Sequence, residues 1–176
     1  AASDIKKLYD VNAEFPKKLA SYCLENKIYC IHFSTDCVFD GLKGSPYTEK
    51  DASTAKDDYG KSKYQGEISN DYCLTLRTSI VGRELLRHKS LFDWVFSQKG
   101  KTLKGFHNAL YTGLTTLEMA KFLKWLLNEN LNLTGIYHLS SKTISKYDLI
   151  VRLNELCNLN LMIEKDTAFY CDRRLD

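Results

Sequence analysis

Apolar positions recur along this chain in two alternating patterns. In some segments they repeat every three or four residues, which is typical of an amphipathic helix, and in others they form short β-branched runs, which favour buried strands. Strands that alternate with helices in this way predict an α/β fold around a parallel sheet. We expect helices over residues 8–25, 59–69, 90–98, 115–127 and 144–157, and strands over residues 28–35, 73–78, 101–105 and 135–139.

The first predicted helix has an apolar face and a proline inside it. The face is the kind that packs against a core. Pro16 predicts a kink or an early turn, because proline has no N–H to donate and disfavours the helix before it. The residues at helical spacing on the apolar face are Val11, Phe15, Leu19 and Tyr22.

The first predicted strand ends in the polar side chains of Ser34, Thr35 and Asp36. The carboxyl ends of buried parallel strands open into the ligand crevice, so a hydroxyl there lies where chemistry usually happens. The loop that follows, residues 36–55, is long for a connection between a strand and a helix, and such loops commonly serve a site. We therefore place the candidate site at this strand end.

Tyr59 and Lys63 stand four residues apart at the start of the next predicted helix, so their phenol and ammonium groups share one face. Two aspartates just before them supply the negative charge that a helix N-terminus favours. A nearby cation favours the phenolate and is expected to lower the pKa of Tyr59, which suits proton transfer near neutral pH. The hydroxyl of Thr35 or Ser34 would hydrogen-bond the same oxygen.

This tyrosine–lysine pair is a weak signal by itself. The chain has 11 tyrosines, and with lysine at roughly one position in ten about one such pair is expected by chance. The alternative is an exposed helix whose lysine stem covers apolar surface. The surrounding residues therefore decide between the two interpretations.

Four stretches around this pair carry a resemblance to a known family. They are residues 34–41 (STDCVFDG), 46–49 (PYTE), 59–67 (YGKSKYQGE) and 77–79 (RTS). In order, spacing and flanking residues they resemble the extended short-chain dehydrogenase/reductase family. Within it the chain is most similar to the dTDP-4-dehydrorhamnose reductase branch, which reduces the 4-keto group of a nucleotide-linked 6-deoxyhexose with NAD(P)H. The resemblance covers nearly the whole chain.

The resemblance implies an activity and a set of site residues. The activity is reduction of a 4-keto-6-deoxy nucleotide sugar by NADP- or NAD-linked chemistry, in deoxysugar and cell-surface polysaccharide biosynthesis. Tyr59 would be the catalytic acid, Lys63 its electrostatic partner and a ligand of the nicotinamide ribose, and Thr35 would hold the substrate carbonyl. Further contacts are implied with the cofactor at Thr78, Ser79 and Asn12, and with the sugar at Asp36, Val38, Phe39 and Arg83.

The chain departs from the family pattern at two places. Cys37 stands where the family usually has an aromatic residue, commonly tyrosine, and residues 107–113 (HNALYTG) stand where the branch usually has Gln-x-x-x-Pro-Thr. The second departure argues for a different sugar or a specialised subgroup. Simpler alternatives stay open for three residues, namely a polar surface position for Asn12 and strand termination for Thr78 and Ser79.

The composition limits the classes of partner and compartment. The net charge of +3 is mild, and the basic residues form no stripe of the kind that nucleic-acid binding needs. No apolar run is long enough to span a membrane, and no signal peptide is visible. The six cysteines include no Cys-x-x-Cys pair and the four histidines have no metal-ligand spacing. We therefore expect reduced thiols, a cytoplasmic location and no metal site.

The resemblance also implies how the chain is divided. Residues 1–82 and 112–142 would be part of a Rossmann-like, doubly wound parallel sheet that binds NAD(P). Residues 83–111 and 143–176 would be part of an interleaved, small α+β cap that binds the substrate. None of the nine glycines forms the glycine-rich turn that normally opens a dinucleotide fold. We expect a piece of a longer protein, inactive alone, whose other part decides between NADH and NADPH.

Two other functions fit the same residues. An epimerase or dehydratase of the superfamily shares the tyrosine and lysine, but dehydratases typically carry an acidic pair, and no glutamate follows Asp36. The alternative from another class is a non-catalytic, reductase-like regulatory subunit, against which the retention of Thr35, Tyr59 and Lys63 argues. The expected ligand is a nucleotide-linked deoxysugar, and association into a homodimer is left open.

Overall fold

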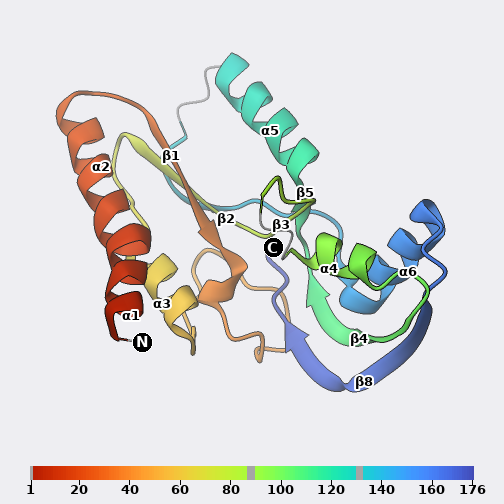
Figure 1. The fold of residues 1–176 in the computed structure, drawn as a ribbon. Coiled ribbons are helices and arrows are strands. Elements are labelled where there is room, and N and C mark those ends of the chain that lie inside the picture. The colour runs from red at the N-terminus through yellow and green to blue at the C-terminus, as the bar shows by residue number, and fades with distance from the viewer. Residues whose placement is uncertain (1, 87–89, 130–132) are drawn as a thin grey trace.

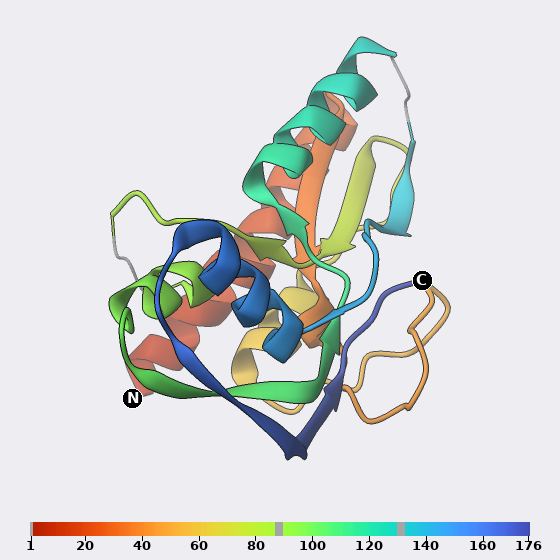
Figure 2. The ribbon, with the colours of Figure 1, turned by 90° about the vertical axis from the view of Figure 1, so that its right-hand side faces the viewer.

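Three parallel strands lie at the centre of the computed structural model, which describes residues 2–86, 90–129 and 133–176. The strands lie side by side in the order β1 (Cys30–Thr35), β2 (Cys73–Thr78) and β6 (Gly135–His138). Both neighbouring pairs are parallel (Figure 2). Thr35 is opposite Thr78. This sheet agrees with the predicted α/β class, and β2 has the predicted bounds.

Helices cover both faces of this sheet (Figure 1). On one face, α1 (Ala2–Tyr9), a π-helical turn η1 (Asp10–Glu14) and α2 (Phe15–Glu25) form one continuous rod beside α3 (Asp58–Gln65). On the other face lies α5 (Thr116–Asn128). Because successive side chains of a strand point to opposite faces, Cys73 packs with Ala20 of α2 while Leu74 packs with Leu126 of α5.

The first helix buries a different face from the one predicted. The four large apolar residues of the predicted face are between 42% and 61% exposed, and small residues such as Ala13 and Ala20 are buried instead. The reason is the close approach of α3, where a Cβ added at Gly66 would overlap the carbonyl oxygen of Asn12. Only small side chains fit at such a contact. The exposed residues are Val11, Phe15, Leu19 and Tyr22.

Pro16 lies in the first turn of α2, directly after the π-helical turn. It has no N–H to donate to the carbonyl of Asn12, four residues earlier, and the wider turn of η1 absorbs this defect. Where a kink or early turn was predicted at Pro16, the chain instead changes from a π-helical turn to an α-helix.

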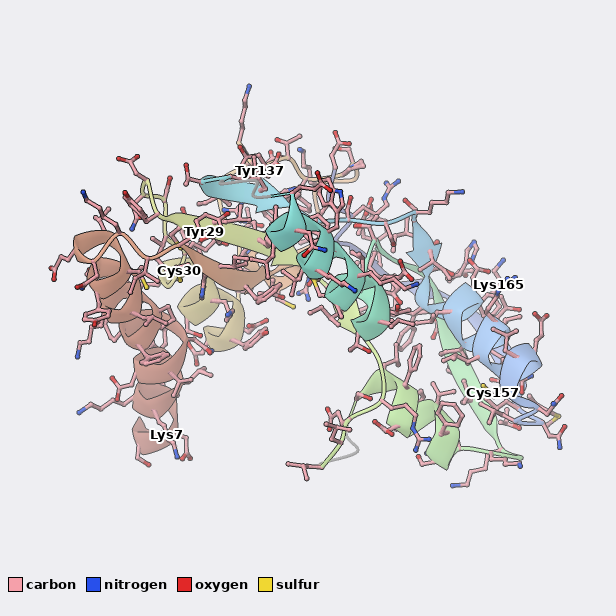
Figure 3. All side chains as sticks on the ribbon, turned by 90° about the horizontal axis from the view of Figure 1, so that it is seen from above. Lys7, Tyr29, Cys30, Tyr137, Cys157 and Lys165 are labelled. Atoms are coloured by element: carbon pink, nitrogen blue, oxygen red, sulfur yellow. The ribbon has the colours of Figure 1, made fainter. Side chains whose placement is uncertain are left out.

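A second sheet lies beside the first one. Its central strand β4 (Thr102–Tyr111) pairs antiparallel with β7 (Ile144–Ser145) and parallel with β8 (Met162–Asp172). α4 (Leu91–Ser97) and α6 (Lys146–Cys157) pack against it around a core that includes Val95, Leu103 and Ile150. The two passages of the chain between the sheets run side by side as β3 (Ile80–Val81) and β5 (Leu114–Thr115). Figure 3 shows Lys7 and Cys30 on one side of the molecule and Cys157 and Lys165 on the other.

The observed bounds of helices and strands differ from the predicted ones mainly where contacts with segments distant in sequence decide them. β4 continues to Tyr111 instead of ending at residue 105, and β8 was not predicted at all. α3 ends at Gln65, four residues early, with Gly66 as its C-cap. Two helices, α5 and α6, begin at hydroxyl caps, because the side chains of Thr115 and Ser145 accept backbone N–H groups at 3.2 and 2.9 Å.

Candidate active site

The carboxyl ends of β1 and β2 open onto a cavity of about 370 Å³, which we call the strand-end cavity. It brings together six of the residues that the sequence nominated, from two strands, one helix and the loops between them. This convergence follows from the parallel pairing of the two strands, which places both carboxyl ends at one edge. The six residues are Thr35, Asp36, Tyr59, Lys63, Thr78 and Ser79, and the remaining lining comes from Phe33, Ser34, Cys37 and Ile80.

The start of α3 is held tightly against the loop after β1. Asp57 is the N-cap, and its carboxylate accepts the N–H of Gly60 at 2.7 Å. A Cβ added at Gly60 would overlap the carbonyl oxygen of Cys37 and lie 2.9 Å from the Cβ of Ala55. Glycine at this position therefore sets how closely Tyr59 approaches the strand end.

Gly60→Ala is expected to destabilise the protein by about 1–3 kcal/mol, because the added methyl group must push α3 away from a backbone carbonyl. In an ordinary helix the same change would stabilise by about 1 kcal/mol. Urea denaturation measures the difference, and Lys61→Ala, at an exposed position of the same helix, is the matched control. An unchanged or increased stability of Gly60→Ala would contradict the close contact.

The environment of Tyr59 acts against the predicted effect of Lys63. Partial burial raises the pKa of the Tyr59 phenol, the nearby Cys37 and Asp36 add to this rise, and the Thr35 hydroxyl opposes it. Lys63 donates to the carbonyl oxygen of Phe33 at 2.6 Å instead. The predicted lowering of the Tyr59 pKa is therefore wrong in this structure, and the phenol stays protonated at neutral pH.

Lys63 and Asp36 are both shifted toward their neutral forms. Burial lowers the pKa of the Lys63 ammonium, and Glu67 partly opposes this change. Burial raises the pKa of the Asp36 carboxyl, which accepts hydrogen bonds from the Thr35 hydroxyl at 3.2 Å and from the Cys37 thiol at 3.6 Å. Water is thus partly excluded from the site, and hydrogen bonds there are stronger than in water.

Four nominated residues lie outside the strand-end cavity. Asn12 donates to the Ser62 hydroxyl at 3.1 Å and ties η1 to α3. Val38 and Phe39 are fully buried in a core cluster, so their side chains do not line the strand-end cavity, and their contact with the sugar stays a prediction. The reason is η2 (Asp36–Val38), a 3-10 turn that directs the chain inward after Asp36.

Arg83 is the fourth of these residues. Its guanidinium lies 3.4 Å from Asp93, in the first turn of α4, and over the ring of Phe96, near the end of the same helix. Arg83 therefore lies outside the strand-end cavity, and its contact with the sugar stays a prediction. The side chain is largely exposed, which keeps its charge in water.

A buried ion pair lies directly beneath the strand ends and had no predicted role. Arg77 of β2 donates to Glu67 at 2.8 and 2.7 Å, and the Ser34 hydroxyl donates to the same carboxylate at 2.6 Å. Glu67 thereby links the end of α3 to β1 and β2, one residue before Thr35 and Thr78. The only sequence signal was that Glu67 and Arg77 belong to the conspicuous stretches 59–67 and 77–79.

A second cavity of about 290 Å³ adjoins the first, and we call it the second-sheet cavity. It shares Asp36, Cys37 and Ser79 with the strand-end cavity. Its other walls come from β4, α6 and the region of β8, which the sequence did not nominate. These walls are Phe106, Ala109, Leu110, Tyr111, Lys146, Phe169, Cys171 and Arg173.

Among residues 2–86, 90–129 and 133–176, no group of three or more histidine, cysteine or acidic side chains is arranged to hold a metal ion. No helix in the same ranges is long and apolar enough to cross a membrane.

A parallel sheet with a threonine at its strand end, followed by a helix that carries tyrosine and lysine, defines the short-chain dehydrogenase/reductase class. Residues 1–161 match the family model described as RmlD substrate binding domain. The chain belongs to this family, and the resemblance inferred from the sequence is confirmed.

Similar proteins agree with this assignment. The dTDP-4-dehydrorhamnose reductase of Burkholderia thailandensis is 40% identical over 71 residues, which cover 40% of this chain and 20% of that protein. The crystal structure of a hypothetical dTDP-4-dehydrorhamnose reductase from Sulfolobus tokodaii is 29% identical with a TM-score of 0.83, over 97% of this chain and 64% of that one. The chain therefore spans less than two thirds of the length of these relatives.

A third comparison concerns the fold alone. The structure of dTDP-4-dehydrorhamnose reductase from Bacillus anthracis in complex with NADP is 17% identical, with a TM-score of 0.83 over 99% of this chain and 66% of that one. The shared fold confirms the Rossmann-like architecture predicted for the parallel sheet.

Proposed function

We propose that this chain supplies the tyrosine–lysine site of an NAD(P)H-dependent reductase that acts on a 4-keto-6-deoxy nucleotide sugar. The observation that carries the proposal is the convergence of Thr35, Tyr59 and Lys63 on one cavity at the ends of two parallel strands. Relatives named dTDP-4-dehydrorhamnose reductase and dTDP-4-keto-6-deoxy-D-glucose reductase support the substrate class.

The residues of this chain would hold the ketone and move one proton. Thr35 donates a hydrogen bond to the substrate carbonyl oxygen and fixes its position. Tyr59 gives its phenolic proton to that oxygen as the carbonyl becomes an alcohol, and its raised pKa keeps this proton in place beforehand. Lys63 stabilises the phenolate that remains, by its positive charge.

The lining of the strand-end cavity suits the nicotinamide end of a cofactor. When bound, a reduced nicotinamide supplies the hydride that adds to the carbonyl carbon, so that the cofactor is oxidised as the ketone is reduced. Lys63 donates one hydrogen bond to the carbonyl oxygen of Phe33, and its ammonium carries three donors, so donors remain for ribose hydroxyls. Thr78 and Ser79 offer further hydroxyls at the same edge. The NADP complex of the Bacillus anthracis relative supports NADP, with NAD as the alternative.

The test is an assay of the natural full-length protein with NADPH and dTDP-4-dehydrorhamnose. We expect one NADPH to be oxidised for each sugar alcohol formed, followed by nicotinamide absorbance and by mass analysis of the product. An isomerised sugar without net NADPH loss would identify an epimerase, and loss of water would identify a dehydratase. No reaction with any keto sugar nucleotide, together with a stoichiometric partner protein, would identify a regulatory subunit.

The two sheets support separate cofactor-binding and substrate-binding parts of the chain. Residues 1–82 and 112–142 would contribute to binding NAD(P), and residues 83–111 and 143–176 would form part of a cap that binds the nucleotide-linked deoxysugar. All six cysteines are free thiols, which supports a cytoplasmic location. A homodimer stays a prediction, which the molecular mass in solution tests.

A further inference from the structure

The hydroxyl group of Thr35 has a single hydrogen, and two acceptors compete for it. In the structure this hydroxyl donates to Oδ1 of Asp36 at 3.2 Å. The proposed reaction needs the same hydrogen for the carbonyl oxygen of the ketone. The N–H of Cys37 donates to the Thr35 oxygen at 3.2 Å and holds that oxygen in place. The hydroxyl therefore changes its acceptor by turning its hydrogen alone.

The protonation state of Asp36 decides which acceptor receives this hydrogen. A carboxylate can only accept, so an ionised Asp36 keeps the hydrogen of Thr35 for itself. A protonated carboxyl group donates its own O–H to the Thr35 oxygen, and the Thr35 hydrogen is then available to the ketone. In this second arrangement the Thr35 oxygen accepts from Asp36 and from Cys37 and donates to the ketone, which uses its full hydrogen-bonding capacity.

The surroundings of Asp36 favour its protonated form. The residue is 7% exposed and lines both the strand-end cavity and the second-sheet cavity, so a proton can reach it from solvent without crossing the core. Burial raises the pKa of the Asp36 carboxyl, and Arg173, the hydrogen bond from Thr35 and Lys146 oppose this rise only in part. The carboxyl group therefore exchanges its proton closer to neutral pH than an exposed aspartate does.

Two cations are the charged groups that act on Asp36 within the part of the chain that the structure describes. Lys146 comes from α6, and Arg173 comes from the segment after β8. The other titratable groups that interact with Asp36 have raised pKa values and are uncharged at neutral pH. They are Cys37 beside it, Tyr59 on α3, Tyr111 on β4 and Cys171 on β8. The charge of Asp36 thus depends on the balance between its burial and two cations of the second sheet.

We propose that Asp36 is a positioning residue whose protonation releases the Thr35 hydroxyl to the ketone, so that binding of the keto sugar is coupled to proton uptake by Asp36. The proton comes from solvent, forms the O–H bond of the carboxyl group and returns to solvent when the product leaves, so the overall reduction is unchanged. This inference rests on the proposed function and deepens it, because it makes the affinity for the ketone depend on pH.

The main experiment measures kcat and kcat/KM of the natural full-length protein against pH, with NADPH and dTDP-4-dehydrorhamnose. Because kcat/KM reports the free enzyme, it should fall by about tenfold or more as the pH rises through the pKa of Asp36. The ketone must then displace a hydrogen bond to a charged group. Because kcat reports the complex, in which Asp36 keeps its proton, it should stay level over the same range. A level kcat/KM would overturn the coupling.

Two variants of Asp36 separate its hydrogen bond from its charge. In Asp36→Asn the amide N–H donates to Thr35 as the protonated carboxyl does, and it cannot ionise, so kcat/KM should keep its low-pH value through the wild-type fall. Asp36→Ala has no donor and should lower this low-pH value by about tenfold. An Asp36→Asn profile that falls as the wild-type profile does would overturn the assignment.

The matched control is Asp57→Asn at the start of α3. This change removes another negative charge that acts on Tyr59, and asparagine caps a helix as well as aspartate does. Its kcat/KM should therefore fall over the same pH range as that of the wild type. A profile of Asp57→Asn without this fall would show that the fall belongs to another group than Asp36. Thermal melting of each variant checks that it is folded.

Lys146→Met provides a readout that a purely structural role of Asp36 would not move. Removing this cation raises the pKa of Asp36 further, so kcat/KM should fall at a higher pH than in the wild type. Lys146→Arg keeps the charge, and its kcat/KM should fall close to the wild-type pH. A fall at the same pH in Lys146→Met as in the wild type would contradict the role of Asp36.

Calorimetry on the wild-type protein tests the coupling without any variant. With oxidised NADP bound the ketone is not reduced, and its binding heats in buffers of different ionisation enthalpy count the protons taken up. At a pH where the free Asp36 is ionised, about one proton should be taken up for each ketone bound. No uptake would overturn the coupling. A protein that reduces no keto sugar would overturn the proposed function as well, whereas normal turnover with a level kcat/KM would overturn the coupling alone.

Discussion

Replacing Tyr59 with phenylalanine in the natural full-length protein is expected to lower turnover by about 10²-fold or more, with little change in cofactor affinity. The substitution removes only the phenolic oxygen, which is the proton donor to the carbonyl, and leaves the ring that helps to form the strand-end cavity. Steady-state rates of NADPH oxidation and a separate titration with NADPH measure the two effects. An unchanged turnover would contradict the proposed role of Tyr59 as the proton donor.

The same helix offers a matched control. Tyr64 is exposed, lies outside the strand-end cavity and is also a tyrosine of α3, so Tyr64→Phe should leave turnover unchanged.

The pH dependence of the turnover rate provides a second test of the role of Tyr59. Because reduction needs the protonated phenol and the Tyr59 pKa is raised, the rate should stay level through neutral pH and fall as the pH rises through that pKa. A fall that begins near neutral pH would show that Lys63 lowers the pKa after all.

The site could be predicted from the sequence where it depends on local pattern and on the rules of parallel sheets. A continuous apolar run that ends in Ser34 and Thr35 identifies a buried strand and its carboxyl end, and the Tyr59–Lys63 spacing identifies a helical face. The parallel rule then brings Thr78 to the same edge as Thr35. These residues share the strand-end cavity because a general rule, the parallel pairing of successive buried strands, brings their segments together.

Val38 and Phe39 could not be placed in this way. They belong to the same stretch as Thr35 and Asp36, and the family resemblance implied that they contact the sugar. Their position depends instead on Tyr47 and on Leu175, 136 residues after Phe39, which complete a core cluster with them. Phe39 stacks on Tyr47 with ring centres 4.0 Å apart. A contact with so distant a residue leaves no local signal.

The residues of the second-sheet cavity were missed for a related reason. β8 is mostly exposed and rich in charged residues, without the strict alternation that marks a half-buried strand. It forms because β4 supplies a parallel partner about 60 residues earlier in the chain, a pairing that no short motif encodes. Arg173 reaches Cys37 only because β8 runs alongside β4 to that point.

Removing the charge of Glu67 is expected to have the largest effect on stability. Its side chain and that of Arg77 are each 3% exposed, and they form a bidentate pair with the Ser34 hydroxyl as a third member. Glu67→Gln would leave a buried guanidinium without its counter-charge, which costs about 3–5 kcal/mol in buried pairs. Urea denaturation should show this loss. Glu118→Gln, which breaks an exposed pair with Lys121, should cost less than about 0.5 kcal/mol.

A double variant distinguishes the net contribution of the ion pair to stability from the cost of leaving one buried charge without its partner. Arg77→Met with Glu67→Gln removes both charges, so the buried guanidinium is no longer left alone, and the double variant should be more stable than the sum of the single losses predicts. Additive losses would mean that the two side chains act independently, in contradiction to their geometry.

Because Ser34 and Arg77 directly precede Thr35 and Thr78, Glu67→Gln should also reduce turnover, through displaced strand ends. Ser34→Ala, which keeps the ion pair, should reduce stability much less.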